Sequence, residues 1–86
     1  MARHRAVARN LFVGAELNIT VNGEETRLTE GTHIAGLLEI LGLKPERLAV
    51  EVNRKLVRRS EWVSTGLGEG DKVEIVHFVG GGESDA

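Results

Sequence analysis

The sequence predicts an α+β domain in which one helix packs on a mixed sheet of four to five strands. Three observations support this fold class: a β-hairpin signal near the start of the regular pattern, one amphipathic helix after it, and an alternating strand near the carboxyl end. A chain of 86 residues has room for one small hydrophobic core. We expect the domain at residues 16–79, between an extension at 1–15 and a glycine-rich tail at 80–86.

The first element is a hairpin. Residues 17–21 alternate between apolar and polar side chains, which is the period of a strand with one buried face. Asn22-Gly23 follows directly, and both positions accept the positive φ that a two-residue hairpin turn requires. A returning strand is therefore predicted at residues 26–28.

A helix of about three turns is predicted next. Thr32 is the expected N-cap, and Gly42 suits the left-handed position that ends a helix. Gly36 in its interior costs about 1 kcal/mol relative to alanine, and it either permits close approach to the sheet or leaves the helix suboptimal. The apolar stripe falls at i, i+3, i+4 and i+7: Ile34, Leu37, Leu38 and Leu41.

The second half of the chain predicts three further strands and one helical turn. In order, these are a strand at 48–53, a charged turn at 54–55, an edge strand at 56–57, a capped helical turn at 60–63, a glycine-rich turn at 66–71 and a last strand at 72–79. Trp62 is expected to seal the core. The helix can bury its stripe only across the apolar face of the hairpin, and a right-handed crossover places the last strand beside the first. This is the β-grasp arrangement.

Composition excludes several kinds of site. Without cysteine, the chain has no disulfide, thiolate metal site or cysteine nucleophile. The three histidines, His4, His33 and His77, fall on separate elements, so we expect no metal site. A net charge of −2 argues against nucleic-acid binding. The apolar runs are too short to span a membrane, and a cytoplasmic location is expected.

Candidate contact residues lie toward the carboxyl end. Val76 and Phe78 should face away from the helix, where they form either a docking patch or a surface covered by the N-terminal arm. Three glycines follow, and a chain without Cβ atoms can enter a narrow cleft fully extended, although such a terminus is commonly disordered. A basic cluster is either a solvated edge or a contact for an acidic partner: Arg54, Lys55, Arg58 and Arg59.

Several short motifs, taken in this order, resemble the ThiS family of ubiquitin-like sulfur carriers in thiamine thiazole synthesis. They are Ile19-Thr20-Val21-Asn22-Gly23, Leu37-Leu38, Leu41-Gly42, Ala49-Val50-Glu51-Val52-Asn53, Arg59-Ser60-Glu61-Trp62, Glu69-Gly70-Asp71-Lys72-Val73-Glu74-Ile75-Val76 and the terminal Gly-Gly. The resemblance covers residues 16–82. It implies a protein co-substrate that binds no cofactor and is not itself an enzyme.

The resemblance also implies a mechanism. A ThiF-like, E1-type adenylyltransferase consumes ATP to activate the terminal glycine carboxylate, a cysteine desulfurase route supplies sulfur, and a ThiG-like thiazole synthase takes it from the resulting thiocarboxylate. Gly82 would carry the activated carboxylate, with Gly81 and Gly80 completing the tail. Val76, Phe78, Arg58 and Arg59 are the expected docking residues.

The sequence departs from the family pattern at the tail, because Glu83-Ser84-Asp85-Ala86 follow Gly82. We expect a peptidase to remove these four residues; the alternatives are a non-native addition or a member without carrier function. Two other functions remain open. One is the related sulfur carrier MoaD, the small subunit of molybdopterin synthase, and the other is a TGS-like β-grasp module that binds RNA or protein.

Overall fold

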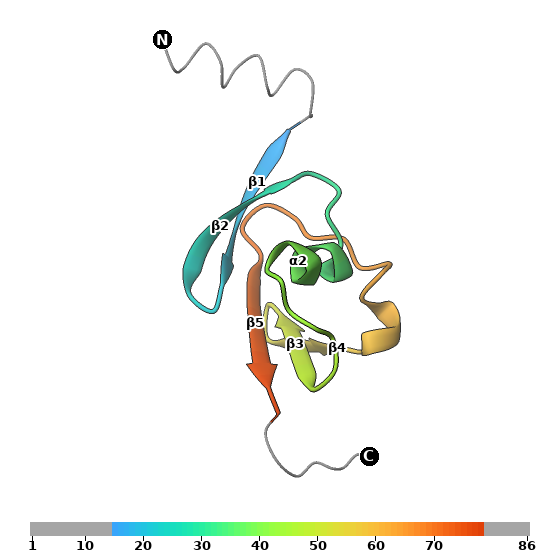
Figure 1. The fold of residues 1–86 in the computed structure, drawn as a ribbon. Helices are drawn as coiled ribbons and strands as arrows, with labels where there is room; N and C mark the ends of the chain where they lie inside the picture. The colour runs from blue at the N-terminus through green and yellow to red at the C-terminus, as the bar shows by residue number, and fades with distance from the viewer. Residues whose placement is uncertain (1–14, 79–86) are drawn as a thin grey trace.

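One mixed sheet of five strands carries helix α2 on one side (Figure 1). The computed structural model describes residues 15–78. Its elements are β1 (Glu16–Val21), β2 (Glu24–Thr29), α2 (Ile34–Ile40), β3 (Leu48–Val52), β4 (Lys55–Val57), the 3-10 helix η1 (Arg59–Glu61) and β5 (Lys72–His77). The strand order is β2-β1-β5-β3-β4, with β5 parallel to β1. The predicted β-grasp fold, with the last strand in the middle, is confirmed.

The hairpin of β1 and β2 forms at the predicted turn. Asn22 and Gly23 both have positive φ, at 50° and 86°. Because a two-residue turn lets pairing begin immediately, the register runs from Val21↔Glu24 to Glu16↔Thr29. Strand β2 is therefore longer than the predicted residues 26–28.

The core lies between α2 and the sheet. Three of the four predicted stripe residues are buried, but Leu41 is 39% exposed because the helix ends before it. Helix α2 has seven residues, two turns instead of three. The buried apolar residues are Leu17, Ile19, Val21, Leu28, Ile34, Leu37, Leu38, Leu48, Val50, Trp62, Leu67, Val73 and Ile75.

The carboxyl end of α2 closes with a Schellman motif around Gly42. The N–H of Gly42 donates to the carbonyl of Glu39 at 3.0 Å, and the N–H of Leu43 donates to that of Leu38 at 2.9 Å. Gly42 has a φ of 74°, a conformation that a Cβ would disfavour. The predicted helix stop is thus at the right residue.

The amino end of α2 differs from the prediction. The N-cap is His33, without a side-chain hydrogen bond, and the Thr32 hydroxyl instead donates to the carbonyl of Thr29 at 2.6 Å. The first helical N–H groups donate to backbone carbonyls from the segment after β4: Ile34 to Thr65 at 3.1 Å and Ala35 to Trp62 at 3.0 Å. Tertiary contacts therefore satisfy the first backbone N–H groups of the helix, which the sequence predicts to be capped by the side chain of Thr32.

The turn between β3 and β4 lies one residue earlier than predicted. Its central residues are Asn53 and Arg54, with φ of 53° and 71°, so Lys55 belongs to β4. The following helical turn, η1, has no side-chain cap, which corrects the cap expected at Ser60. Trp62 is buried as predicted, and its indole N–H donates to the carbonyl of Val57 at 2.9 Å.

The predicted extension, apart from Ala15, and the chain from Val79 onward, including Gly80, Gly81 and Gly82, lie outside the described residues. Within residues 15–78, no helix has the length and apolar character needed to cross a bilayer.

Candidate functional site

The described chain leaves the sheet through its central strand, β5. This strand pairs in parallel with the end of β1, and its antiparallel pairing with β3 continues from Val52↔Val73 to Leu48↔His77. One residue further, the N–H of Phe78 donates to the carbonyl of Arg47 at 2.8 Å. The exit therefore lies at the end of the sheet opposite the start of β1, as Figure 1 shows, and the backbone is held by hydrogen bonds up to its last described residue.

The sheet face away from α2, which we call the open face, carries exposed apolar side chains beside this exit. Alternation along β5 puts Val76 and Phe78 there, and they are 54% and 53% exposed. Ala49 is in register with Val76, and Leu56, 69% exposed, shares this face because it is in register with Glu51. We define Ala49, Leu56, Val76 and Phe78 as the open-face patch.

The predicted orientation of Val76 and Phe78 is confirmed, whereas Leu56 was not predicted as part of the site. Its exposure follows from the register of a three-residue edge strand, which only the paired structure reveals. From the sequence alone, Leu56 between Lys55 and Val57 indicates a strand, but it does not indicate which of these side chains faces solvent.

The two arginines predicted to dock a partner lie in different surroundings. Arg58 follows β4 in an extended conformation, so alternation puts it on the same side as Leu56. Arg59 begins η1, and its guanidinium lies 5.6 Å from the ring centroid of the buried Trp62, a cation–π arrangement. Arg58 therefore lies on the same face as the open-face patch, while Arg59 packs on the indole.

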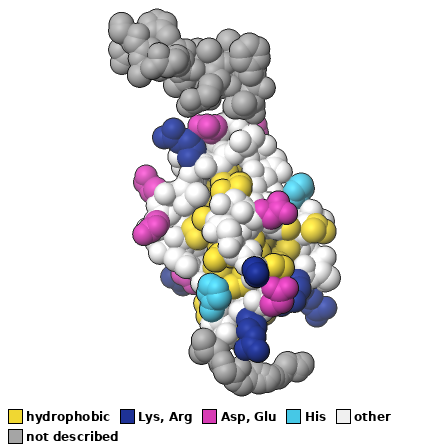
Figure 2. All heavy atoms as spheres, in the orientation of Figure 1, with side chains coloured by type: hydrophobic (Ala, Val, Ile, Leu, Met, Phe, Trp, Pro, Cys, Tyr) yellow, Lys and Arg dark blue, Asp and Glu magenta, His cyan; other side chains and the backbone are white. Residues whose placement is uncertain are grey.

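Exposed apolar residues also occur away from the open face. Figure 2 shows one face of the molecule, on which hydrophobic atoms are visible between acidic and basic side chains. Among residues 15–78, Ile40, Leu41 and Val63 are large, apolar and exposed, like Leu56, Val76 and Phe78. Of these described residues, only Leu56, Val76 and Phe78 lie on the open face, beside the point where the chain leaves the sheet.

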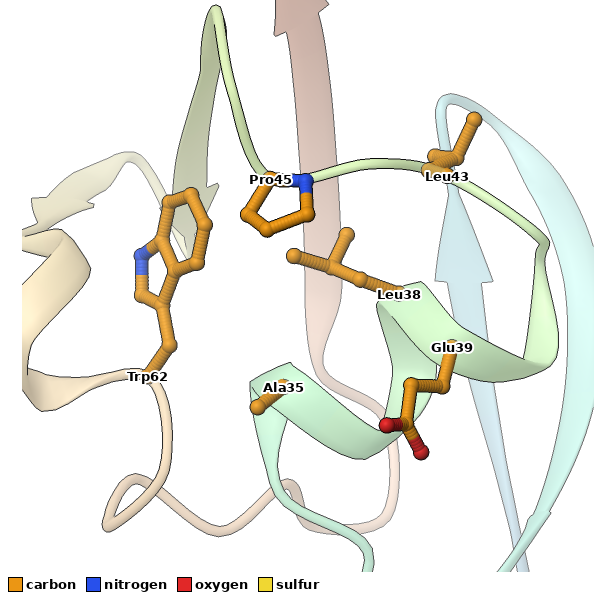
Figure 3. A pocket seen from close by; sticks show the side chains of 6 residues that line it. All are labelled: Ala35, Leu38, Glu39, Leu43, Pro45 and Trp62. Carbon is orange, nitrogen blue, oxygen red and sulfur yellow. The ribbon is translucent and has the colours of Figure 1, made fainter.

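A shallow apolar hollow lies on the helix side of the sheet. Figure 3 shows the side chain of Leu38 directed toward Pro45 and Trp62, with the Glu39 carboxylate turned away. The volume is about 170 Å³, which is below the several hundred Å³ typical of small-molecule pockets. Its lining residues are Ala35, Leu38, Glu39, Leu43, Pro45 and Trp62. We interpret it as a packing irregularity at the edge of the core.

Side chains able to hold a metal do not converge within the described part of the chain, where no group of three or more His, Cys, Asp or Glu residues comes together. Among residues 15–78, the candidate site therefore consists of the exposed open-face patch and the point at which the chain leaves the sheet.

Comparison with known proteins decides the family. The family model described as "ThiS family" matches residues 11–82. This chain belongs to the ThiS family. The match includes β5, the open-face patch and the three glycines, and it ends before Glu83.

Solved structures of a ThiS-family member have the same fold. The crystal structure of thiamine biosynthesis protein ThiS from Geobacter metallireducens superposes with a TM-score of 0.69 at 33% identity, covering 77% of this chain and all of that one. A solution NMR structure of a thiamine biosynthesis protein from the same organism gives a TM-score of 0.63 at 32% identity, covering 81% and 94% of the two chains.

Longer proteins contain a segment similar to this ThiS-family chain. A thiazole synthase from Magnetococcus marinus is 43% identical over 67 residues, which cover 78% of this chain and 21% of the relative. One from Paramagnetospirillum magneticum is 36% identical over 70 residues, covering 81% and 22%. The chain thus spans about a fifth of these two relatives. An uncharacterized protein, ycf40, from Porphyra purpurea is 36% identical over 71 residues, which cover 83% of this chain and its own full length.

Proposed function

We propose that this protein carries sulfur for the synthesis of the thiamine thiazole, on the carboxyl end of Gly82. The observation that carries the proposal is the ThiS family match, which runs through Gly82 and stops before the acidic residues. The carrier is a co-substrate: it supplies the reacting carboxylate and a surface by which enzymes hold it. A chain without cysteine can carry sulfur in this way, because the sulfur is bound to a backbone carbonyl carbon.

The chemistry requires activation, because a carboxylate is a poor acyl donor. In the adenylation step, an oxygen of the Gly82 carboxylate attacks the α-phosphorus of ATP and pyrophosphate leaves. A sulfur nucleophile then attacks the acyl carbon of the mixed anhydride and AMP leaves. With hydrosulfide as the nucleophile, loss of a proton gives the thiocarboxylate directly. None of these steps requires a catalytic residue from the carrier itself.

Four kinds of partner follow from this proposal. A ThiF-like adenylyltransferase binds ATP and the tail, a cysteine desulfurase route provides sulfur, and a ThiG-like thiazole synthase accepts it. The similarity to segments of two thiazole synthases supports the last of these. The matched names refer to thiamine and thiazole formation, which favours this pathway over molybdopterin synthesis.

The fourth partner is a peptidase. In the sequence as it stands, the carbonyl of Gly82 is in a peptide bond to Glu83, so it has no carboxylate to adenylate. We propose that hydrolysis of this bond removes residues 83–86 and exposes the Gly82 carboxylate. Intact mass of the protein from its native cells tests this step, and a sole form that retains Ala86 would contradict it.

Docking is assigned to the open-face patch, which lies beside the exit of the tail. Val76 and Phe78 provide exposed apolar area, and Arg58 adds a charge on the same side. Arg59 is left out of this role because its guanidinium packs over Trp62. An enzyme that binds this face would also contact the chain at Phe78, where it leaves the sheet.

Pyrophosphate release tests the proposed function. The chain ending at Gly82 and the chain ending at Ala86 are each incubated with ATP and a ThiF-type enzyme. We expect carrier-dependent pyrophosphate release only from the shorter chain. Equal release from both chains would show that the Gly82 carboxylate is not the group activated.

A further inference from the structure

Two carboxylates face each other across the middle of the open face. Glu51 on β3 is in register with Glu74 on β5, so both side chains project from the same side of adjacent strands. Directly opposed like charges on neighbouring strands are destabilising. The pair occupies two central strands of the sheet, where Glu74 is exposed and Glu51 is half-buried.

No cation within residues 15–78 forms an ion pair with either carboxylate. The ion pair between described side chains is Glu16 with Arg27, on the β1–β2 hairpin. Lys72 lies on the same face, two residues before Glu74, without making such a contact. Neither carboxylate is therefore paired directly with a cation of the described domain.

The acidic pair borders the open-face patch. Leu56 is in register with Glu51, and Val76 follows Glu74 by two residues on the same face. A partner that covers the patch must therefore also cover the two carboxylates. Desolvating two adjacent negative charges is costly unless the partner supplies a positive charge.

We infer that the open face docks an enzyme surface in which apolar side chains lie next to a Lys or Arg placed over Glu51 and Glu74. The inference rests on the proposed function, and the occupant is assigned to the adenylating enzyme that first receives the tail. Because every copy of the chain carries a net charge of −2, charge complementarity favours a cationic enzyme surface over a second copy of the chain.

The first test is made on the free carrier. Glu51→Gln and Glu74→Gln should each raise the melting temperature by roughly 2–6 °C, and the double variant should gain little more than either single one. Glu25→Gln is the matched control, because Glu25 is an exposed carboxylate on β2 of the same sheet, opposite Thr20. Additive gains, or no gain beyond the control, would overturn the inference.

The second test measures binding of the chain ending at Gly82 to a ThiF-type enzyme by calorimetry. Each variant of the pair should raise Kd by about 3- to 30-fold, and the double variant should flatten its salt dependence, while Glu25→Gln leaves Kd near the wild-type value. Unchanged or tighter binding of the Glu51 and Glu74 variants to the ThiF-type enzyme would overturn the inference. Two other results would also overturn it: binding that is weakened for a thiazole synthase but not for the ThiF-type enzyme, and a dimer of the carrier detected by sedimentation. If the inference is overturned but the wild-type chain still forms the thiocarboxylate, the proposed function stands. If the wild-type chain ending at Gly82 is not activated, the proposed function itself is contradicted.

Discussion

The side chain of Asn22 hydrogen-bonds both backbone groups of Ile75. Its amide oxygen accepts from the N–H of Ile75 at 2.8 Å, and its amide nitrogen donates to the carbonyl at 3.2 Å. Strand β1 ends at Val21, so this side chain takes the place of one more strand residue beside β5. The turn residue that reverses the chain therefore also holds the strand that leads to the tail.

Replacing Asn22 should loosen β5. Asn22→Gly keeps the positive φ accessible and removes two hydrogen bonds, so we expect a loss of roughly 1–3 kcal/mol in unfolding free energy. Asn22→Ala should lose about 1 kcal/mol more, because alanine disfavours the left-handed conformation. Urea unfolding measures both changes, and hydrogen exchange should quicken at the Ile75 amide. Wild-type stability in Asn22→Gly would contradict the role of the side chain.

Gly36→Ala should stabilise the domain. A Cβ built at Gly36 would have its nearest neighbour, Cγ2 of Thr32, at 3.5 Å, an ordinary van der Waals distance. The sequence left two explanations for a glycine at this position, close approach to the sheet or a suboptimal helix. The ordinary distance around the Cβ excludes the first. Because alanine favours the helical backbone, we expect a gain of up to about 1 kcal/mol in urea unfolding. A loss would show that the helix needs room at this position.

Val76→Glu and Phe78→Glu should weaken partner binding while preserving the fold. Both residues are more than half exposed, so little buried area is lost on substitution, whereas a carboxylate in the patch would be costly to bury in an interface. We expect Kd for the ThiF-type enzyme to rise at least about tenfold, with cooperative unfolding retained. Val63→Glu, exposed and outside the patch, is the matched control. Loss of cooperative unfolding would show instead that these residues are core.

Gly81→Ala and Gly82→Ala should impair activation without unfolding the domain. A Cβ widens the chain where an enzyme channel must fit it closely. Both positions lie outside residues 15–78, which contain the hydrophobic core. Thiocarboxylate formation by the chain ending at position 82 is the measurement, with the melting temperature as control. Normal rates in both variants would contradict a narrow channel around the tail.

The fold could be predicted largely because its signals are local. The Asn22-Gly23 turn, the apolar stripe of α2 and the helix stop at Gly42 each depend on a few neighbouring residues. The errors arise where distant segments decide. Carbonyls of Trp62 and Thr65 cap the helix in place of a side chain of Thr32.

The β3–β4 turn shows the same effect. Asn53 takes a φ of 53°, and its side chain accepts from the N–H of Lys72 at 2.9 Å and donates to Asp71 at 3.0 Å. These long-range hydrogen bonds favour a turn centred on Asn53 and Arg54 over the turn at Arg54 and Lys55 that the sequence predicts. Leu67 joins the core from a glycine-rich turn for a similar reason, since its N–H donates to the carbonyl of Thr32.

The candidate site was predictable in part. Alternation along the last strand was sufficient to place Val76 and Phe78 on the open face. The opposition of Glu51 to Glu74 and the exposure of Leu56 depend on strand register, which a single sequence does not specify across separate strands.

Mass spectrometry of the carboxyl-terminal peptide is the most direct test of sulfur transfer. The chain ending at Gly82 is incubated with ATP, a ThiF-type enzyme and hydrosulfide, and then digested. We predict that the peptide gains the mass difference between one sulfur and one oxygen, located at Gly82 by fragmentation and absent when ATP is omitted. A peptide whose mass stays unchanged, while a ThiS carrier known to be active is converted under the same conditions, would contradict the account.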